Sequence, residues 1–560
     1  MSTTKDTQAA PTKADSNKKN SPGGFLGVVE KIGNRLPDPF WLFVILGATV
    51  LVFSWIGSRI GVSAEDPATG ENIEVTNLLT AEGIQQIFSD AVTNFTSFPP
   101  LGVIITVMLG VAVAEHAGLI SALVRAMVSK VSAPMLTFAV AIAGVTGSIA
   151  SDAVYVILIP IGAMSFHALG RSPIVGAMVA FAASSAGFNA SLILNITDVL
   201  LGGISTSAAQ FVNPDYEVSP LANYFFVIAS TIVLSLIITA VTEFFVKDKA
   251  RQLVDHDDLD TSQLQFQKVE DGTADAPAED PKDTSGDNAN SKEPNENPPV
   301  TREDLQLSAT ESRALAITGW ATLAYLAAYF ALLFIPASPL YSDEGAMESP
   351  LIRAVAVPIA LMFFTLGLVY GVAAGTIKAA ADVPEFMARG IKTLVPMIVL
   401  FFAVSQFLAW FQWSNIGILT AIKGSDLLQR WDLPNIVLFA ALVLMVAGLN
   451  LLITSGSAQW ALMAPVVVPM MMYVGIAPEV TQMLFRIGDS PTNIITPMSP
   501  YFALALMFLQ RYYKRAGVGT LMSLALPYSI AMLVGWFAFF VLWYWIGIPL
   551  GPGTPYEYAF

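Results

Sequence analysis

Apolar stretches long enough to cross a lipid bilayer recur along the chain from Phe40 to Ile548. The first runs from about Phe40 to Ile60, and similar stretches alternate with polar loops up to the C-terminal end. One crossing of the hydrocarbon core takes about 20 apolar residues. Because a water-facing shell does not account for this pattern, it predicts an all-α protein that crosses a membrane many times.

The charges of the loops predict which side of the membrane each loop occupies. The first 36 residues contain six Lys and Arg, whereas the loop 61–100 contains six acids and no Lys or Arg. Since cytoplasmic loops carry the excess of positive charge, the N-terminus is predicted inside and this loop outside. The tail after Ile548 has no base and is predicted outside, while Lys423 and Arg430 are exceptions in a segment that must be outside.

Two apolar stretches, 133–168 and 433–474, begin and end on the same side of the membrane by this rule. Each can be two crossings or one re-entrant hairpin, and the loop charges do not separate the two. The arms of the first stretch are short for full spans of about 20 residues. We therefore favour two hairpins, which leaves nine crossings.

The order of the predicted elements repeats in the two halves of the chain. Each half has two or three spans, an amphipathic segment (116–131 or 414–432), a hairpin, a span with a polar break and a last span. One hairpin enters from each side, so the halves form an inverted repeat, which is typical of alternating-access secondary transporters. The predicted parts are a disordered cytoplasmic tail (1–36), a first membrane repeat (37–250), an acidic disordered cytoplasmic loop (251–312), a second membrane repeat (313–548) and an extracytoplasmic tail (549–560).

Composition supports the membrane class and excludes others. Only 13% of the residues are charged, about half the share of an average soluble domain. Most of the net charge of −15 falls in 255–304, where 15 acids accompany 4 bases. The absence of Cys and the three scattered His exclude thiol chemistry and disfavour a zinc centre. No basic patch indicates a nucleic-acid partner, and no nucleotide motif supports ATP-driven pumping.

Four ionisable residues fall at membrane depth, where each costs at least about 2.5–3.5 kcal/mol. Asp152 lies at the tip of the first hairpin and Asp198 in the break of the first half, while Arg486 and Asp489 open the break of the second half. Gly, Pro and Asn in these breaks free backbone groups and helix ends, which attract anionic substrates and cations. The two breaks and two hairpin tips are therefore predicted to converge near the midplane as a transport site.

Structural roles stay open for some of these positions. Arg486 and Asp489 are three residues apart, so they can neutralise one another on one helix face. Asp152 can cap the hairpin tip instead of binding an ion. Trp460, which follows the polar tip of the second hairpin, can face lipid instead of a pocket.

At these residues the sequence resembles the p-aminobenzoyl-glutamate transporter (AbgT) family of bacterial inner-membrane proteins. The resemblance covers about Phe25 to Leu550, without the acidic loop 255–304. It implies a homodimer with nine spans and two opposed hairpins per protomer that moves p-aminobenzoyl-glutamate or exports sulfonamides. The motifs that carry it are Ser148-Ile-Ala-Ser-Asp-Ala153, Gly187-Phe-Asn-Ala-Ser with Asn195-Ile-Thr-Asp198, Ser455-Gly-Ser-Ala-Gln-Trp460 and Gly488-Asp-Ser-Pro-Thr-Asn-Ile-Ile-Thr-Pro-Met-Ser499.

The resemblance also implies which residues line the substrate cavity. A folate fragment, which is a small aromatic carboxylate, offers a ring, an amide and two carboxylates. Trp460 can stack on the ring, and Arg486 can bind a carboxylate through two hydrogen bonds. Ser457 and Asn450 can bind the amide. The implied cavity residues, to which we add Asn195, are Asp198, Asn450, Ser457, Trp460, Arg486, Asp489 and Pro497.

We expect no enzyme activity, no resident cofactor and no firmly bound metal, and a proton or sodium gradient as the driving force. Asp198 and Asp489 are the proton candidates, because a buried carboxyl group can hold a proton. A sodium ion is expected between the tip of the first hairpin (Ser148, Asp152) and Asn189. Protons are favoured for export, and sodium stays open for uptake.

Three alternatives accompany this hypothesis. A transporter of the same architecture could carry another carboxylate, such as a dicarboxylate, and only Trp460 argues for an aromatic ligand. An intramembrane aspartyl protease is suggested by Ile487-Gly-Asp489 with Asp198 as its partner, but a cation at Arg486 conflicts with a dyad that shares one proton. A channel is disfavoured because helix breaks in inverted halves predict a site that closes.

Overall fold

The computed structural model describes residues 37–67, 70–129, 131–150, 153–253, 307–343, 345–346, 349–497 and 499–559. The predicted tail 1–36 and most of the predicted acidic loop 251–312 lie outside the described residues. Asp152, at the predicted tip of the first hairpin, also lies outside them.

The described chain is almost entirely helical, with one two-stranded sheet in which β1 (Ser63–Glu65) pairs antiparallel with β2 (Asn72–Glu74). Short 3-10 turns cover Ala133–Met135 and Gly147–Ala150, and a π-helical turn covers Thr242–Val246. The helices of the first half are α2 (Pro39–Ile60), α3 (Ala81–Ser89), α4 (Ala91–Thr96), α5 (Pro99–His116), α6 (Leu119–Ser129), α7 (Leu136–Thr146), α8 (Ala153–Ala168), α9 (Pro173–Ala186), α10 (Ile196–Ala209), α11 (Tyr224–Val241) and α12 (Lys247–Leu253). Those of the second half are α13 (Ala309–Phe334), α14 (Pro350–Arg353), α15 (Ala356–Ala374), α16 (Asp382–Trp413), α17 (Ile416–Trp431), α18 (Asn435–Asn450), α19 (Gly456–Tyr473), α20 (Pro478–Asn493), α21 (Pro500–Tyr512) and α22 (Val518–Ile546).

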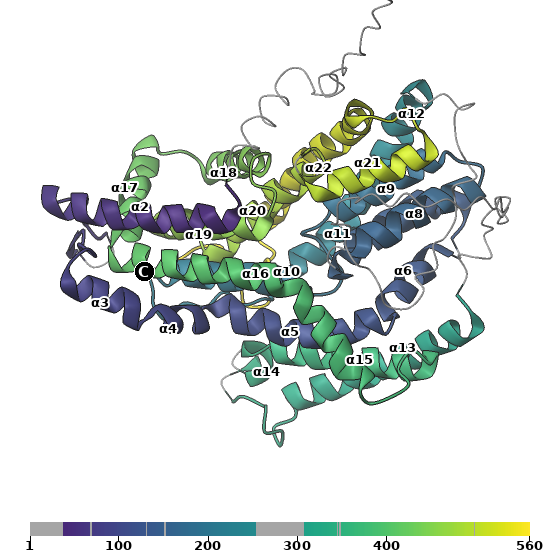
Figure 1. Ribbon diagram of the computed structural model, residues 1–560, viewed down its shortest axis with the longest axis horizontal. Helices are drawn as coiled ribbons and strands as arrows, with labels where there is room; N and C mark the ends of the chain where they lie inside the picture. Colours follow the sequence, from purple (N-terminus) through teal and green to yellow (C-terminus); the bar gives the residue numbers. More distant parts are fainter. Residues whose placement is uncertain are drawn as a thin grey trace, which may run out of the picture.

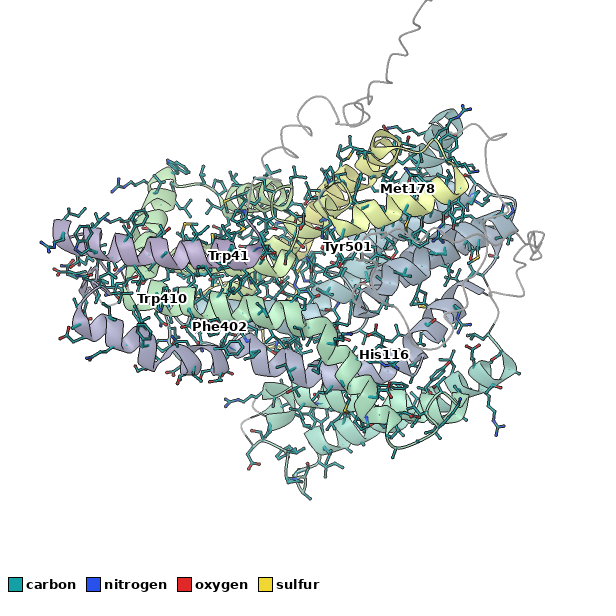
Figure 2. All side chains as sticks on the ribbon, viewed as in Figure 1. Trp41, His116, Met178, Phe402, Trp410 and Tyr501 are labelled. Atoms are coloured by element: carbon teal, nitrogen blue, oxygen red, sulfur yellow. The ribbon has the colours of Figure 1, made fainter. Side chains whose placement is uncertain are left out.

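Seven helical segments of the described chain are long and apolar enough to cross a membrane, namely α2, α5, α11 with its continuation to Ala250, α13, α15, α16 and α22. Their outer faces carry large apolar side chains, such as Trp41, which is 58% exposed, and Phe402, which is 46% exposed (Figure 2). Side chains of this kind are stable against lipid, so the protein is a polytopic membrane protein. Helix α16 bends along its length (Figure 1), because Pro396 in its interior cannot donate a backbone hydrogen bond.

The shorter helices follow the order that the hydrophobic pattern predicts. The two amphipathic segments form α6 and α17, and the two candidate hairpins form the pairs α7–α8 and α18–α19. At a rise of about 1.5 Å per residue, α7 with 11 residues is about half as long as the hydrocarbon core is thick. Residues 187–195 separate α9 from α10, which is the predicted break of the first half.

Helix α20 is longer than the sequence predicts. Arg486 and Asp489 do not open the second break but lie inside the helix, which continues through Pro491 to Asn493. The interruption before α21 covers only 494–499. Pro491, in the last turn of this helix, removes one backbone hydrogen bond and crowds the preceding turn, at a cost of about 3 kcal/mol that tertiary packing offsets. Helices α9, α10, α18, α19 and α22 pack around α20 and supply the burial that holds it together.

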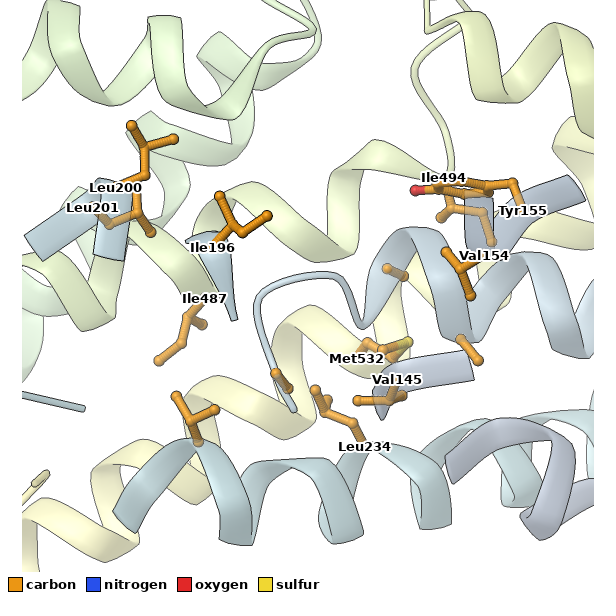
Figure 3. Close-up of a cluster of buried hydrophobic side chains, with 14 of the residues drawn as sticks. Val145, Val154, Tyr155, Ile196, Leu200, Leu201, Leu234, Ile487, Ile494 and Met532 are labelled. Atoms are coloured by element: carbon orange, nitrogen blue, oxygen red, sulfur yellow. The ribbon is translucent and has the colours of Figure 1, made fainter. Parts of the chain in front are cut away.

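The core lies where helices from both halves meet around α20. Away from α20, small residues allow very close packing of backbones between α5 and α15 and between α8 and α9. Figure 3 shows part of this apolar core, in which the labelled side chains come from α7 (Val145), α8 (Val154, Tyr155), α10 (Ile196, Leu200, Leu201), α11 (Leu234), α20 (Ile487), the turn after it (Ile494) and α22 (Met532).

Gly110→Ala is expected to destabilise the protein by about 1–3 kcal/mol, because the added methyl group overpacks the α5–α15 contact. A Cβ at Gly110 would lie far inside van der Waals distance of the Ala360 carbonyl oxygen. Gly102 on the same helix is the matched control, since a Cβ there meets no atom within 4 Å. Gly102→Ala should leave the melting temperature of the detergent-solubilised protein unchanged or raise it. Equal melting temperatures for the two variants would contradict the close helix contact.

Candidate functional site

Helix α20 carries the centre of the candidate site. All of its residues from Pro478 to Thr492 are buried, although several of them are polar or charged. Arg486 is 1% exposed and Asp489 is 2% exposed. Buried charges persist only when other groups pair with them or hydrogen-bond to them, so the partners of these two residues define the site.

Arg486 forms an ion pair with Asp198 of α10, on the other half of the chain. Its Nη1 lies 2.6 Å from Asp198 Oδ1 and donates a longer hydrogen bond of 3.4 Å to the Asn189 carbonyl oxygen. The open alternative, in which Arg486 simply neutralises Asp489 on its own helix, is therefore wrong for this conformation. The pair connects the two halves of the chain at a point buried from solvent.

Local sequence places Asp198 for this pairing. Asn195 is the N-cap of α10 and Asp198 is its third residue, and the two form a reciprocal capping box. The Asn195 backbone N–H donates to Asp198 Oδ2 at 2.9 Å, and the Asp198 N–H donates to Asn195 Oδ1 at 3.2 Å. Because one carboxyl oxygen caps the helix, the other is free to accept from Arg486.

Asp489 is held by the segment between α9 and α10, and the start of α19 lies close to it. Asn189 donates from Nδ2 to Asp489 Oδ2 at 2.7 Å, and its backbone N–H donates to Ser490 Oγ at 3.0 Å. A Cβ on Gly456, the first residue of α19, would lie 3.2 Å from both Asp489 carboxyl oxygens. A side chain at this position would therefore have to push the carboxyl group back by a few tenths of an ångström.

Asn450 fastens the end of α18 to α20. The two hydrogens on its Nδ2 are shared among three acceptors, the Asp489 carbonyl oxygen at 2.8 Å, Thr492 Oγ1 at 2.8 Å and Asn493 Oδ1 at 2.9 Å. Asn450 therefore contacts the backbone carbonyl of Asp489, and it does not bind the carboxyl group of that residue.

The segment between α7 and α8 reaches the site through Ser148. Asn195 Nδ2 donates to Ser148 Oγ at 3.3 Å, and Ser148 Oγ donates to the carbonyl oxygens of Val145 at 3.0 Å and Ala190 at 3.3 Å. Ser148, after α7, therefore contacts the segment 187–195 that separates α9 from α10.

Trp460 is fully buried on α19, which excludes a lipid-facing position. Its ring packs on Phe485 with centroids 4.6 Å apart, and its indole N–H donates to Ser205 Oγ at 3.0 Å. Ser457 lies three residues earlier, with its Oγ 3.2 Å from that of Ser455. Pro497 lies in the turn after α20 and is half-buried.

The site combines a cation, two carboxyl groups and an indole in a conformation closed to solvent. Three of its polar atoms are buried without a hydrogen-bond partner in the described chain, namely Arg486 Nε, Asp489 Oδ1 and Asn450 Oδ1. Unsatisfied groups are rare in protein interiors and are expected to take an ion, water or ligand. No group of three or more His, Asp and Glu among the described residues could hold a metal ion.

The sequence interpretation missed several polar residues that contact this site. Ser490 accepts from the Asn189 backbone, and Ser205 accepts from Trp460. Gln482 accepts from Ser205 at 2.7 Å. A helical spacing would have revealed one of them, because Gln482, Arg486, Asp489 and Asn493 recur every three or four residues along one face of α20.

Comparisons with known proteins agree on one family. The model of the AbgT transporter family matches residues 24–275 and 287–558. The chain is 36% identical over 535 residues to the p-aminobenzoyl-glutamate transport protein of Escherichia coli (strain K12), covering 95% of this chain and 96% of that protein.

Two solved structures are similar over nearly the whole chain. The Alcanivorax borkumensis YdaH transporter is 37% identical with a TM-score of 0.79, over 92% of this chain and 100% of that chain. Neisseria gonorrhoeae MtrF, described among a class of antimetabolite efflux pumps, is 38% identical with a TM-score of 0.84, over 95% of this chain and 100% of that chain.

Proposed function

Since the chain belongs to the AbgT transporter family of multi-pass inner-membrane proteins, we propose that it is an ion-coupled secondary transporter for p-aminobenzoyl-glutamate or related folate fragments and sulfonamides, working by alternating access. The observation that carries this proposal is the buried Arg486–Asp198 pair. It joins a helix break of one half to a helix of the other, at the place where both candidate hairpins end. A carboxylate ligand and Asp198 then compete for one guanidinium group.

The proposed substrate fits the chemistry of the closed site. Arg486 binds a substrate carboxylate once Asp198 releases it, and its unpartnered Nε supplies a second donor for the bidentate geometry. Trp460 turns its ring from Phe485 to the aromatic ring of the substrate. Ser457, at the start of α19, and Asn450, at the end of α18, lie on either side of the hairpin tip and bind the amide.

We propose protons as the coupling ion. Protonation of Asp198 removes its charge and frees Arg486, and return of the proton to water restores the pair. Asp489 is the second candidate, because its Oδ1 has no hydrogen-bond partner in the described chain. Sodium near Ser148, Asp152 and Asn189 is the competing proposal.

We also propose the finer architecture of nine crossings, two opposed hairpins and a homodimer, with the N-terminus cytoplasmic and the C-terminus extracytoplasmic. The shortness of α7 supports a hairpin for α7–α8. The arrangement speaks against the aspartyl protease, because Arg486 engages Asp198 and a cation beside the dyad conflicts with one proton shared by two carboxyl groups.

Flux of labelled p-aminobenzoyl-glutamate in proteoliposomes tests the substrate and the ion together. We expect flux that follows an imposed proton gradient and is insensitive to sodium, and we expect Asp489→Asn to reduce it by at least about tenfold, the equivalent of one hydrogen bond to a charged group. Asp432→Asn, on an exposed acid at the end of α17, is the control.

Each outcome of this experiment decides a separate point. Flux that follows sodium alone would replace the proton proposal. Folded protein without flux under either gradient would remove this substrate, and dicarboxylates and sulfonamides would then be tested in the same vesicles.

A further inference from the structure

A second buried carboxyl group lies on α20 outside the candidate site. Glu479, at the N-terminal end of this helix, is 5% exposed, and no Lys, Arg or His of the described chain forms an ion pair with it. The Tyr216 hydroxyl lies 3.1 and 3.0 Å from its two carboxyl oxygens. An ionised carboxylate buried without a cation is costly, and such a group avoids the cost by taking up a proton.

The groups around Glu479 do not supply the missing cation. Tyr558 of the C-terminal segment packs on Tyr216 with ring centroids 5.7 Å apart. Burial and the neighbouring Glu479 raise the pKa of Tyr216, so its hydroxyl keeps its proton. Arg486 lies seven residues further along α20 and is paired with Asp198. Three acids on the adjoining segments are exposed and add only negative charge: Asp215, Glu217 and Glu557.

A line of buried hydrogen bonds connects Glu479 to the indole of the candidate site. Asn223, the N-cap of α11, donates to the Glu479 carbonyl oxygen at 3.0 Å and accepts from Gln482 Nε2 at 3.1 Å. Gln482 accepts in turn from Ser205, which accepts from Trp460. The side-chain amides of Asn223 and Gln482 do not conduct protons. These hydrogen bonds therefore couple the position of one residue to that of the next. A shift at the beginning of α20 therefore moves the partners of Trp460.

We propose that Glu479 is a proton-binding site of the transport cycle, which takes up a proton from the adjoining aqueous side when this end of the protein closes and returns it when this end opens. The inference rests on the transport function proposed above. In the step, a hydronium ion of the adjoining water gives up a proton: one of its O–H bonds breaks and leaves a neutral water, and an O–H bond forms on one carboxyl oxygen of Glu479. The neutral carboxyl group can be buried against Tyr216, whereas the carboxylate requires water.

Glu479 is a positioning residue in this scheme, because it does not touch the substrate site. Its protonation permits closure of the contact between Tyr216 and α20, and the line through Asn223 and Gln482 then holds Ser205 beneath Trp460. In the proposed topology this end is extracytoplasmic, so the proton enters from that side.

Infrared difference spectroscopy on the full-length protein in bacterial-lipid vesicles tests the proton site without requiring transport. Spectra recorded across a pH step should contain the C=O stretch of a protonated carboxylic acid that disappears in Glu479→Gln. Glu557→Gln, on an exposed acid at the same end, should leave this band unchanged. Tyr216→Phe should keep the band but shift its frequency, because the carboxyl group loses its hydrogen-bond partner.

A band that survives Glu479→Gln unchanged would overturn the proposal. If Glu479→Gln does not fold, Tyr216→Phe tests the assignment of the band. An unshifted band in Tyr216→Phe would show that the protonated acid is not Glu479.

The pH dependence of flux then tests the coupling. In Glu479→Gln, flux should no longer depend on the pH of the aqueous side that adjoins Glu479, because the amide mimics the protonated carboxyl group. In Glu479→Asp, which keeps a carboxyl group, flux should still depend on that pH. An unchanged pH profile in Glu479→Gln would reject the coupling. Absence of any flux in the unaltered protein would remove p-aminobenzoyl-glutamate as the substrate, and the infrared result on Glu479 would still stand.

Discussion

Replacing Arg486 by alanine is expected to abolish transport and to destabilise the folded protein by about 3–5 kcal/mol, the cost of leaving the partner of a buried ion pair unpaired. The partner is Asp198, which is 5% exposed and keeps one oxygen on its helix cap, so it cannot turn to solvent. Asp198→Ala should have a similar cost, because it leaves the guanidinium buried and also removes a cap contact. Denaturation of the protein in detergent, alongside flux, measures both effects.

A double variant separates the structural from the transport role of the pair. Asp198→Asn with Arg486→Gln removes both charges while keeping similar volumes, so most of the lost stability should return. Flux should not return, because no guanidinium remains for the substrate carboxylate. Arg389→Ala is the matched control, since Arg389 pairs with Glu385 at an exposed position where such bridges contribute little. Recovery of flux in the double variant would exclude Arg486 as the substrate-binding group.

Trp460→Ala is expected to lower stability by about 3–5 kcal/mol and to abolish transport, because it empties the space of a fully buried indole. Trp536 of α22 is a matched control within the same chain. It is also fully buried, and its indole N–H donates to Ser230 Oγ at 2.8 Å, as that of Trp460 donates to Ser205. Trp536→Ala should therefore have a similar cost in stability.

The phenylalanine variants of the two tryptophans distinguish packing from binding. Both substitutions keep an aromatic ring and remove the indole N–H, and both should cost much less stability than alanine. Only Trp460→Phe should raise the substrate concentration needed for half-maximal flux, because Trp536 lies outside the site. The same change in flux for both variants would mean that Trp460 acts through the stability of the fold alone.

Local patterns predicted the order and the approximate extent of most of the long helices. The run from Phe40 to Ile60 becomes α2, and the amphipathic segment 414–432 becomes α17 almost residue for residue. Asn195 and Asp198, three residues apart, are within reach of each other along the chain and form a helix cap. The extent of α20 was missed, because Gly488 and Pro491 weaken a helix locally while the surrounding helices stabilise it.

Partners that lie far apart in the chain could not be derived from local patterns. The sequence gives Arg486 two acids of equal chemistry, and proximity favours Asp489, yet the ion pair forms with Asp198 from the other half. Likewise, nothing local distinguishes Glu479 from a surface acid at a helix start, and only the packing of Tyr216 over it shows that it is buried.

The sequence by itself determined that this protein is a helical, multi-span membrane protein of the AbgT family with polar and ionisable residues inside its apolar segments. These properties follow from hydrophobic periodicity, loop charge and motifs, which act over a few residues. The tertiary structure alone decided which carboxyl group Arg486 pairs with. It also decided that Trp460 is fully buried and that Glu479 is buried without a cation among the described residues. These outcomes depend on which residues far apart in the chain can contact one another simultaneously in a close-packed core, and the whole fold determines that.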